Sequence, residues 1–519
     1  MRAGAWVGWL IGVVTAAVAV GVGELAAAFV RPAAAPVIAV GNRLITLTPS
    51  GLRRSAIEST GTNDKPLLIL GIYVLLALFG ALIGSLALHR VIFGLAGVAL
   101  LAAFGAYCAA TADAGRPSDV VPTLVGAAAA AVVLVALVHL ARQYQNAPLD
   151  NEGHGPDAAA PQAGADRRRF LFGAAGAAAV AAVAGFGGRA TQSARYGVSA
   201  QRAALTLPGG GTAPVPRGAD LGKSGVPWRT PNALFYRIDR ALEVPQIAPT
   251  DWTLTIDGLV EHPLTLNYHE LLSRELVDRW ITLCCVSNPV GGELVSNALF
   301  RGVRLADVLR EAGLSDSADE LLMTGADGTT IGAPAKVVTD GREALLAVAM
   351  NGVPLPLEHG FPVRVVVPGL YGYVSACKWV QHIEATTFAA RRAFWVENGW
   401  APHPELRLES RIDRPSSGEL LPVGRTVAVA GVAWDQHVGV SRVEVQVDYG
   451  PWQPARLAAV PSADTWRQWV LPWAPPRAGS YVLRVRAVDA RGRVQDPTVR
   501  PVFPSGASGY HAVTVRAGT

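Results

Sequence analysis

The sequence predicts a multi-domain protein with N-terminal transmembrane helices, a central α+β domain and a C-terminal β-sandwich. Apolar residues make up 50% of the 519-residue chain and charged residues only 16%, and the long apolar stretches all come before residue 190. Beyond them, short β-branched runs mix with helical patches, and evenly spaced strand patterns follow. We therefore divide the chain into a membrane region (1–189), a linker (190–225), an α+β domain (226–403) and a β-sandwich (404–519).

The membrane region contains about five apolar segments that predict transmembrane helices. Each approaches or exceeds the ~20 residues that an α-helix needs to cross a hydrocarbon core. A cleavable signal peptide is the alternative interpretation of the first segment, although it lacks a clear small-residue cleavage site. The segments are Ala5–Val30, Leu67–Leu88, Val91–Thr111, Val121–Leu140 and Phe170–Gly188.

The orientation of the chain is predicted by Arg167, Arg168 and Arg169, which directly precede the fifth segment. Short basic flanks stay in the cytoplasm, so the residues after Gly188 are expected on the extracytoplasmic side. Arg-Arg-x-Phe-Leu also resembles a twin-arginine export signal, with a plain positive-inside anchor as the alternative. One observation opposes this topology. The loop between the first two segments is basic, yet the topology places it outside the cytoplasm. That loop carries Arg31, Arg43, Arg53, Arg54 and Lys65.

Residues 190–225 are rich in Gly, Ala, Pro and Thr, which is typical of a linker. In the α+β domain that follows we expect a strand at Trp252–Gly258, a helix at Thr265–Leu276 and a buried strand at Phe361–Val367. The last domain shows regular strand patterns with turn residues between them, which favours an immunoglobulin-like sandwich that is structural or mediates dimerisation. Its clearest strands are Val427–Trp434, Val440–Asp448 and Ser480–Val488.

Cys284 and Cys285 leave a strand-like run and enter a loop that ends in Gly291 and Gly292. The other two cysteines, Cys108 and Cys377, are far away in sequence, so spacing predicts neither a zinc site nor a disulfide framework. A thiol on a loop suits ligation of a soft metal centre. The alternative is a buried cysteine that acts as a small hydrophobe.

Several segments together resemble the sulfite oxidase family of molybdopterin-dependent oxidoreductases, in its membrane-anchored bacterial type. They occur in family order over residues 226 to 518 and are followed by a β-sandwich that begins near Ser410. The segments are Phe235-Tyr236-Arg237-Ile238-Asp239, Cys285-Val286-Ser287-Asn288, Glu358-His359-Gly360-Phe361-Pro362-Val363-Arg364, Pro368-Gly369 and Lys378-Trp379.

The resemblance implies a Mo-molybdopterin cofactor in the α+β domain, with Cys285 rather than Cys284 as the protein ligand of the metal. Arg237 is expected beside the metal, where it would stabilise an oxyanion or a charged oxo ligand. The residues that the resemblance assigns to cofactor binding are Phe235, Tyr236, Arg237, Asp239, Cys285, Asp327, His359, Arg364, Ser375 and Lys378.

Each basic residue of this set has a chemical reason to contact the cofactor. Arg364 and Lys378 carry the positive charge that a buried phosphate requires. His359 is expected to donate a hydrogen bond to a pterin or phosphate oxygen.

Two departures from the family pattern limit the substrate assignment. Pro289 and Val290 follow the cysteine core where sulfite-oxidising members carry arginines, and Gly399-Trp400 stands where we align their tyrosine near the metal. Fewer cations weaken the case for a small dianion such as sulfite. The sequence also lacks a Cys-x-x-Cys-His haem site, so the electron partner is expected to be separate or in the membrane, a quinone or a haem protein.

The sequence therefore predicts an enzyme of the cell membrane that performs two-electron oxo-transfer chemistry on a small molecule outside the cytoplasm. A reductase of sulfoxides that uses membrane electrons is one alternative, and a cofactor-free surface scaffold is another. The formal charge of +5 is small for this length and gives no basis for nucleic-acid binding. By resemblance, the sandwich would mediate a homodimer.

Overall fold

The computed structural model describes residues 5–49, 51, 64–145, 160–209, 214–222, 227–403 and 405–518. It divides into two compact units, and each is described by itself below. The helical unit contains Met1–Gly197 and Ala241–Gln246, and the β-rich unit contains Val198–Arg240 and Ile247–Thr519. The domain boundaries that the sequence predicts at residues 225 and 404 fall outside the described ranges.

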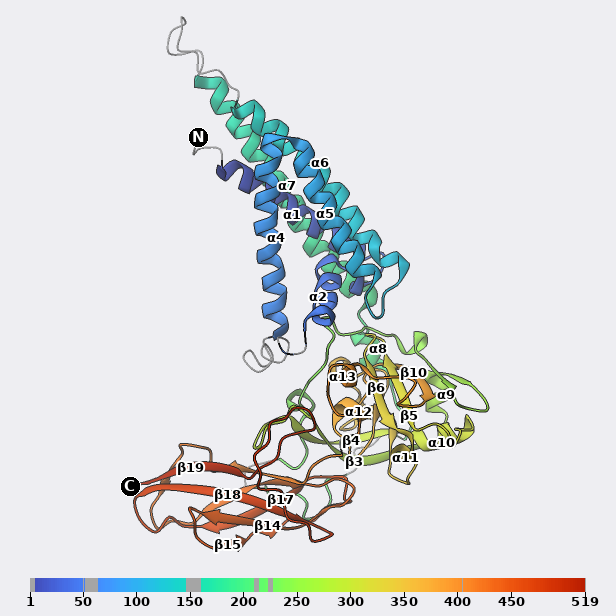
Figure 1. Ribbon diagram of the computed structural model, residues 1–519, viewed down its shortest axis with the longest axis vertical. Helices are drawn as coiled ribbons and strands as arrows, with labels where there is room; N and C mark the ends of the chain where they lie inside the picture. The colour runs from blue at the N-terminus through green and yellow to red at the C-terminus, as the bar shows by residue number, and fades with distance from the viewer. Residues whose placement is uncertain are drawn as a thin grey trace, which may run out of the picture. The chain divides into compact units, whose positions relative to one another are not determined.

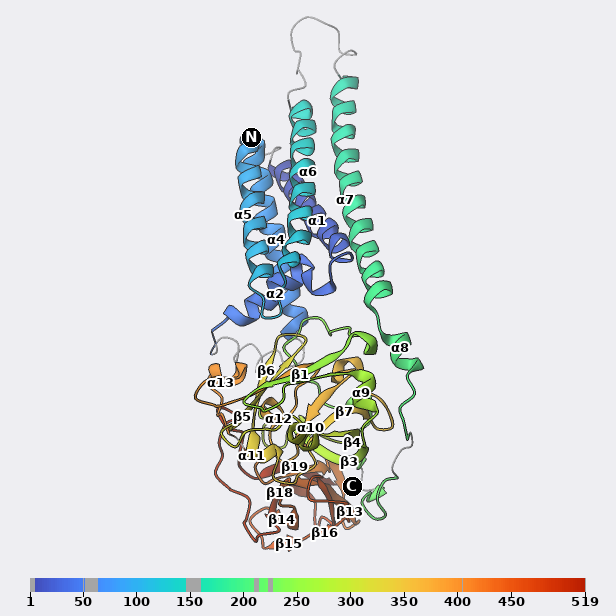
Figure 2. The same ribbon diagram turned by 90° about the vertical axis from the view of Figure 1, so that its right-hand side faces the viewer.

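The helical unit is built around α1, which packs against α4, α6 and α7 (Figure 2). Among the described residues, five helices are long and apolar enough to cross a membrane, which agrees with the five segments predicted from the sequence. The elements are α1 (Ala5–Ala27), η1 (Pro32–Ala34), α2 (Pro36–Leu47), α4 (Asp64–His89), α5 (Val91–Ala110), η3 (Pro117–Val120), α6 (Val121–Gln145) and α7 (Ala160–Tyr196).

Glycines bring the backbones of these helices together. A Cβ on Gly12 of α1 would clash with the carbonyl oxygen of Gly80 on α4, and a Cβ on Gly126 of α6 would clash with the carbonyl oxygen of Ala19 on α1. Such close approach is how small residues stabilise helix pairs where lipid removes the hydrophobic driving force. The bundle therefore depends on the absence of side chains at specific positions.

The basic loop between the first two spans is folded in the structure. It contains α2, which the sequence analysis did not predict, and Arg31 pairs with the buried Asp119 and donates to the carbonyl oxygen of Ala114. Arg43 lies 5.8 Å from the ring of Tyr107. Much of the positive charge that opposed the predicted topology thus has partners inside the unit, while Arg53 and Arg54 lie outside the described residues.

Helix α7 extends beyond the predicted span and occupies the first residues of the predicted linker. It ends at Tyr196, and a short helix, α8 (Ser199–Ala204), follows. Arg202 of α8 donates to the carbonyl oxygens of Pro354 and Leu355 at 2.6 Å each. The alanines of this stretch favour helix, which explains why the first part of the predicted linker is helical.

Two sheets form the first part of the β-rich unit (Figure 1). One has the order β2-β1-β10-β5-β6 and the other β3-β4-β7-β8, with β9 paired to β7. The strands are β1 (Thr253–Gly258), β2 (Leu264–Asn267), β3 (Leu276–Cys284), β4 (Val295–Arg304), β5 (Glu320–Gly325), β6 (Thr330–Pro334), β7 (Leu345–Met350), β8 (Val353–Pro354), β9 (Arg364–Val366) and β10 (Val380–Thr386).

Short helices connect these strands, and one of them corrects the sequence prediction. The expected helix at Thr265–Leu276 begins only at Tyr268, because Asn267 and Glu270 form a capping box that fixes the helix start there. The helical elements are η5 (Asn232–Leu234), η6 (Pro249–Asp251), α9 (Tyr268–Leu272), α10 (Leu305–Glu311), α11 (Ala335–Val338), η7 (Leu357–His359), α12 (Gly372–Ser375) and α13 (Phe394–Glu397).

The C-terminal part contains two further sheets, β11-β13-β17-β16 and β12-β19-β18-β14-β15, whose inward side chains share one apolar core. A β-rich C-terminal region is therefore confirmed, and its immunoglobulin-like character stays a prediction. The strands are β11 (Glu409–Arg414), β12 (Leu420–Pro422), β13 (Val427–Trp434), β14 (Val440–Val447), β15 (Trp452–Pro454), β16 (Arg456–Leu457), β17 (Arg467–Trp473), β18 (Gly479–Asp489) and β19 (His511–Gly518).

The two parts of the β-rich unit are joined by hydrogen bonds at Thr282, the residue two positions before Cys284. The Thr282 hydroxyl accepts from Trp466 N at 2.7 Å, and its backbone N–H donates to Asp464 O at 3.0 Å. The Trp466 indole donates to Trp228 O at 2.9 Å. The C-terminal sheets thus hold the strand that leads into the cysteine loop.

Candidate functional site

The cysteine loop begins where β3 ends. Cys284 is the last residue of the strand and is fully buried in the main core, and Cys285, 7% exposed, is the first residue of the loop. The loop is closed by Asn288 N, which donates to Cys285 O at 3.0 Å. Ser287 N donates to Cys285 Sγ at 3.4 Å. The loop therefore fixes the position of one sulfur and leaves the other in the core.

The electrostatic surroundings also distinguish the two thiols. Burial raises the pKa of both, but hydrogen bonds from Ser287 and the charge of Lys378 oppose that rise at Cys285. At Cys284 the charges of Glu409 and Cys285 raise the pKa further. A thiolate is the metal-binding form, so these surroundings favour Cys285 as the ligand.

Arg364, on β9, is a buried cation without a carboxylate partner among the described residues. It is 3% exposed, donates to His359 O at 3.2 Å, and lies 5.8 Å from the Phe300 ring, while its Nε has no hydrogen-bond partner there. Burial lowers its pKa to about 10, so it stays charged at neutral pH. A buried, unpaired charge costs several kcal/mol in order of magnitude, which predicts an anionic ligand at this position.

Lys378 supplies a second buried cation, and it connects the segment Phe235–Asp239 with this region. Its Nζ donates to Asp239 at 3.3 Å and to Glu358 O at 3.0 Å. Burial lowers its pKa to about 8, and Asp239 opposes that shift. The Asp239 carboxylate is shared with Arg237, which donates to it at 2.7 Å.

Arg237 itself is partly exposed, with 43% of its side chain accessible. Its charge lowers the pKa of His359 and Lys378, and among the described residues its side chain donates to Asp239. The structure therefore places it with the cation cluster, and its expected position beside the metal stays a prediction.

His359 is 2% exposed, and its Nε2 lies 3.2 Å from Asn232 O. Burial and then Arg364 lower its pKa to about 3, so the ring is neutral. Because a carbonyl oxygen only accepts, Nε2 carries the proton and Nδ1 presents a lone pair. Nδ1 has no partner among the described residues, so it would accept from a ligand, where the sequence analysis expected a donor.

Two aromatic rings complete this cluster. Phe235 stacks on Tyr236, with ring centroids 5.5 Å apart. It also forms a T-shaped pair with the His359 ring, with centroids 5.4 Å apart. Burial raises the pKa of Tyr236 well above its usual value, and the charges of Cys285 and Cys284 raise it further. The phenol is therefore a neutral hydrogen-bond donor near the cysteine loop.

Asp327 and Ser375 already have partners within the protein. Asp327 accepts from Thr329 N at 3.1 Å and from its hydroxyl at 2.6 Å in the turn between β5 and β6. Ser375 is fully buried and donates to Leu370 O at 3.2 Å. These hydrogen bonds shape the backbone of their loops, so their assignment to cofactor binding stays a prediction.

Sequence reasoning missed Tyr373 and Glu409. Burial raises the pKa of Tyr373, and the charge of Cys285 raises it further. The Tyr373 hydroxyl donates to Ala401 O at 2.6 Å, and the centroid of its ring lies 5.8 Å from that of the Trp400 ring. Glu409 of β11 is buried, its pKa is raised to about 8 by burial, and Asn288 opposes the shift. A tyrosine thus lies near Cys285 although the aligned position holds Gly399-Trp400.

The C-terminal sheets also contact the cysteine loop. Arg411 of β11 donates to Gly292 O at 2.7 Å, and a Cβ on Gly291 would clash with the ring of His511. Gly291 has a φ of +75°, which also favours glycine. No pattern in the sequence pairs positions more than a hundred residues apart, so this contact was not predictable.

Across the described residues, no group of three or more His, Cys, Asp or Glu side chains could hold a metal ion. A metal at Cys285 therefore needs further ligands from a cofactor. A dithiolene cofactor with a phosphate supplies two sulfurs for the metal and an anion for the buried cations. Cys285, Arg364, Lys378 and the Nδ1 atom of His359 fit such a group.

The comparison with known proteins agrees with this donor set. Residues 241–395 match the family described as "Oxidoreductase molybdopterin binding domain". This range contains Cys285, His359, Arg364 and Lys378, and it defines the class of the protein.

Similarity to individual proteins extends beyond this domain. Mitochondrial sulfite oxidase of Homo sapiens is 34% identical over 53% of this chain and 58% of its own length. Sulfite oxidase of Gallus gallus is 32% identical over 53% of this chain and 69% of its own length. A solved structure, "Crystal Structure of the Sulfane Dehydrogenase SoxCD from Paracoccus pantotrophus", covers 56% of this chain and 82% of that chain with 23% identity and a TM-score of 0.49.

The chain belongs to the sulfite oxidase family of molybdenum-dependent oxidoreductases. This membership confirms the sequence prediction of the family and implies a Mo-molybdopterin cofactor. The chain spans 58% of the length of the human relative and 69% of that of the chicken relative, so their activities do not transfer with the family name.

Proposed function

We propose that this protein is a membrane-anchored molybdopterin-dependent enzyme that performs two-electron oxo-transfer on a small molecule outside the cytoplasm. The observation that carries the proposal is the position of Cys285 in a region whose buried cation, Arg364, has no carboxylate partner among the described residues. The cofactor, when bound, supplies a metal centre that exchanges two electrons and an oxygen atom with the substrate.

The roles of the protein residues follow from their surroundings. Cys285 would bind the metal, and Arg364 and Lys378 would neutralise the cofactor phosphate. Tyr236 and Tyr373 stay neutral because their pKa values are raised, so they do not act as bases. Tyr236 could donate a hydrogen bond to a ligand, whereas the Tyr373 hydroxyl already donates to Ala401 O.

The anchoring is supported by five helices of spanning length in the described part of the chain and by the three arginines before the apolar part of α7. The positive-inside rule then assigns the β-rich unit to the extracytoplasmic side. Export by the twin-arginine route stays a prediction. The electrons would pass to a separate partner, a quinone or a haem protein.

The substrate is proposed to carry less negative charge than sulfite. Pro289 and Val290 stand where sulfite-oxidising relatives are expected to carry cations. Both side chains are uncharged, so they cannot stabilise a dianion. A neutral or singly charged oxygen acceptor suits such a site better.

Metal analysis of the full-length protein tests the proposal. The variants Cys285→Ser and Cys284→Ser form a matched pair for this test. After expression in a molybdate-replete host, the wild type and Cys284→Ser should contain about one molybdenum per chain, because one thiolate binds one metal centre. Cys285→Ser should lose turnover with artificial electron acceptors. Full turnover in Cys285→Ser, or a wild type without molybdenum, would refute the assignment.

The direction of the reaction follows from the same preparations. An oxidase reduces an artificial acceptor when substrate is added, whereas a reductase oxidises an artificial donor. A wild-type protein that contains no cofactor but binds a partner protein would instead support the scaffold interpretation.

A further inference from the structure

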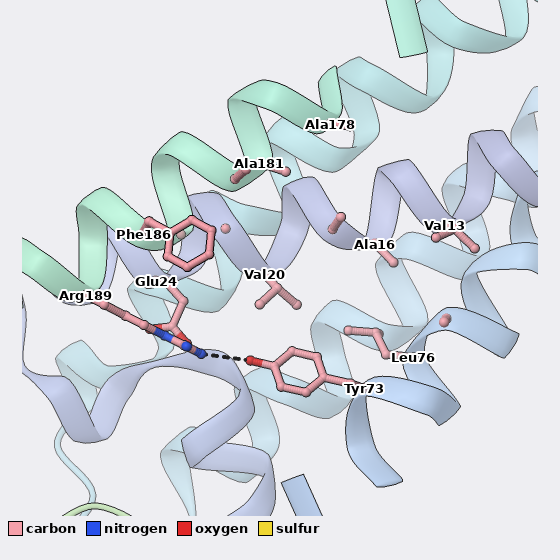
Figure 3. Close-up of a pocket in the computed structure, with 15 residues that line it drawn as sticks. Val13, Ala16, Val20, Glu24, Tyr73, Leu76, Ala178, Ala181, Phe186 and Arg189 are labelled. Carbon is pink, nitrogen blue, oxygen red and sulfur yellow. Dashed lines mark hydrogen bonds and ion pairs between the residues drawn. The ribbon is translucent and has the colours of Figure 1, made fainter. Parts of the chain in front are cut away.

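A cavity of about 410 Å³ lies between α1, α4 and α7 within the helical unit (Figure 3). Its volume is in the range of ~300–1,000 Å³ that is typical of small-molecule sites. Small apolar side chains form most of the wall, and Figure 3 shows the polar side chains together at one end. The apolar wall includes Val13, Ala16, Val20, Leu76, Ala178 and Ala182.

The polar end contains Glu24, Tyr73 and Arg189. Arg189 donates to the Tyr73 hydroxyl at 3.0 Å and lies 3.8 Å from the Glu24 carboxylate. Glu24 is 5% exposed and also accepts from the Gln192 amide at 3.3 Å. A carboxylate inside an apolar helix is costly, so residues of this type in a membrane span generally mark a functional position.

A second carboxylate, Glu243, approaches the same end from the segment Ala241–Gln246, which belongs to the helical unit. Burial raises the pKa of Glu243 to about 7, the charge of Glu24 raises it too, and Arg189 opposes the shift.

We propose that this cavity binds a quinone, with its ring at the polar end beside Tyr73 and Arg189 and its apolar tail along α1 and α7. Tyr73 and Arg189 donate hydrogen bonds to carbonyl oxygens, and Glu24 accepts from the hydroxyl that a reduced ring carries. The inference rests on the proposed function, and it selects the quinone from the two electron partners, a quinone or a haem protein, that the proposed function allows.

The charge of the polar end favours a neutral ligand over a phospholipid head group. Arg189 is balanced by Glu24, and Glu243 adds further negative charge when ionised. An anionic phosphate would meet carboxylates at this position, whereas a quinone ring carries no charge.

The electron count is also consistent. Transfer of an oxygen atom from water to one substrate molecule releases two electrons and two protons. One quinone takes up two electrons and two protons to become a quinol.

Equilibrium binding of decylubiquinone to the full-length protein in nanodiscs tests the inference without any turnover. Ala182→Phe should fill the cavity and weaken binding at least about tenfold, which corresponds to about 1.4 kcal/mol. Ala179→Phe is the matched control on the same helix, since Ala179 is exposed and does not line the cavity. Tyr73→Phe should weaken binding by a smaller factor, and Tyr107→Phe should leave it unchanged.

Unchanged binding in Ala182→Phe, or no binding to the wild type, would overturn the inference. Equal weakening by Ala179→Phe would do the same. Displacement of the probe when phosphatidylglycerol replaces a zwitterionic lipid would identify a lipid site instead. Because turnover with a soluble dye needs no quinone, a protein that is active with the dye but does not bind the probe would disprove only the quinone site.

Discussion

Arg364 and Glu24 are both buried charged side chains, one in the β-rich unit and one in the helical unit, and their surroundings differ. Glu24 has Arg189 at 3.8 Å and a hydrogen bond from Gln192. Arg364 has a carbonyl oxygen and an aromatic ring, and no carboxylate among the described residues. One charge is neutralised by the protein, and the other is not.

This difference indicates which kind of ligand each unit accepts. A buried cation without a partner is stable only if a bound anion compensates it, which fits the phosphate of molybdopterin. A buried carboxylate that is already paired leaves no net charge for an ionic ligand, which fits a neutral ring. Changes at these residues should therefore have effects of different size and sign.

The largest effect is expected for Arg364→Met, which removes the unpaired cation. The purified variant should contain less than about a tenth of the wild-type molybdenum, since a charge-assisted contact to phosphate is lost. The cofactor-free form should nevertheless be more stable than cofactor-free wild type, by about 1–4 kcal/mol, because a buried ion is replaced by an apolar side chain. Metal analysis and thermal unfolding measure the two effects.

Arg342→Met is the matched control, because Arg342 is also largely buried but pairs with Asp340 at 2.7 Å. This variant should lose stability and keep its molybdenum. If both variants destabilised the cofactor-free protein equally, Arg364 would not be an uncompensated charge.

The second effect concerns Glu409, which the β-rich unit keeps neutral beside the cysteine loop. Its folded pKa of about 8 exceeds the ordinary value of 4.5, so its contribution to stability is full below pH 4.5 and is lost as pH rises toward 8. Glu409→Gln mimics the neutral form. Above pH 8 the free energy of unfolding of Glu409→Gln should therefore exceed that of the wild type by about 2–4 kcal/mol. Near pH 4 the two proteins should have almost the same free energy of unfolding.

Unfolding of both proteins across pH 4 to 9 measures this difference, with exposed Glu405→Gln as the control. A stability difference that does not change between pH 5 and 8 would contradict the raised pKa of Glu409.

The third effect tests how the helical unit is held together. Gly12→Ala places a methyl group against the backbone of α4 and should destabilise the bundle by about 1–3 kcal/mol. Gly176→Ala, on α7, meets no atom within 4 Å and should stabilise its helix by about 0.5–1 kcal/mol. Thermal unfolding in detergent separates the two, and equal effects would show that α1 and α4 are not closely packed.

The sequence allowed the five spans and the strands at Val427–Trp434 and Val440–Val447 to be predicted because hydrophobic periodicity is local. The segments assigned to cofactor binding could be recognised in the sequence because each is a short motif, and their roles stay predictions. The proximity of Tyr373 and Glu409 to the cysteine loop was not, since it results from long-range packing. The pairing of Arg31 with Asp119 was missed for the same reason.

The smallest effect is expected for Glu24→Gln. Glutamine keeps a hydrogen-bonding oxygen for Gln192, and Arg189, 60% exposed, can turn toward the surface of the bundle. We therefore expect a loss of less than about 1 kcal/mol, as for pairs in which one partner remains solvated. The pKa of Glu243 should fall, because the Glu24 charge that helps to raise it is absent. Thermal unfolding measures the first effect, and infrared titration of the carboxyl band measures the second. A loss as large as that of Gly12→Ala would mean that Glu24 is needed for the fold, and the contrast with Arg364 would then concern stability and not ligand type.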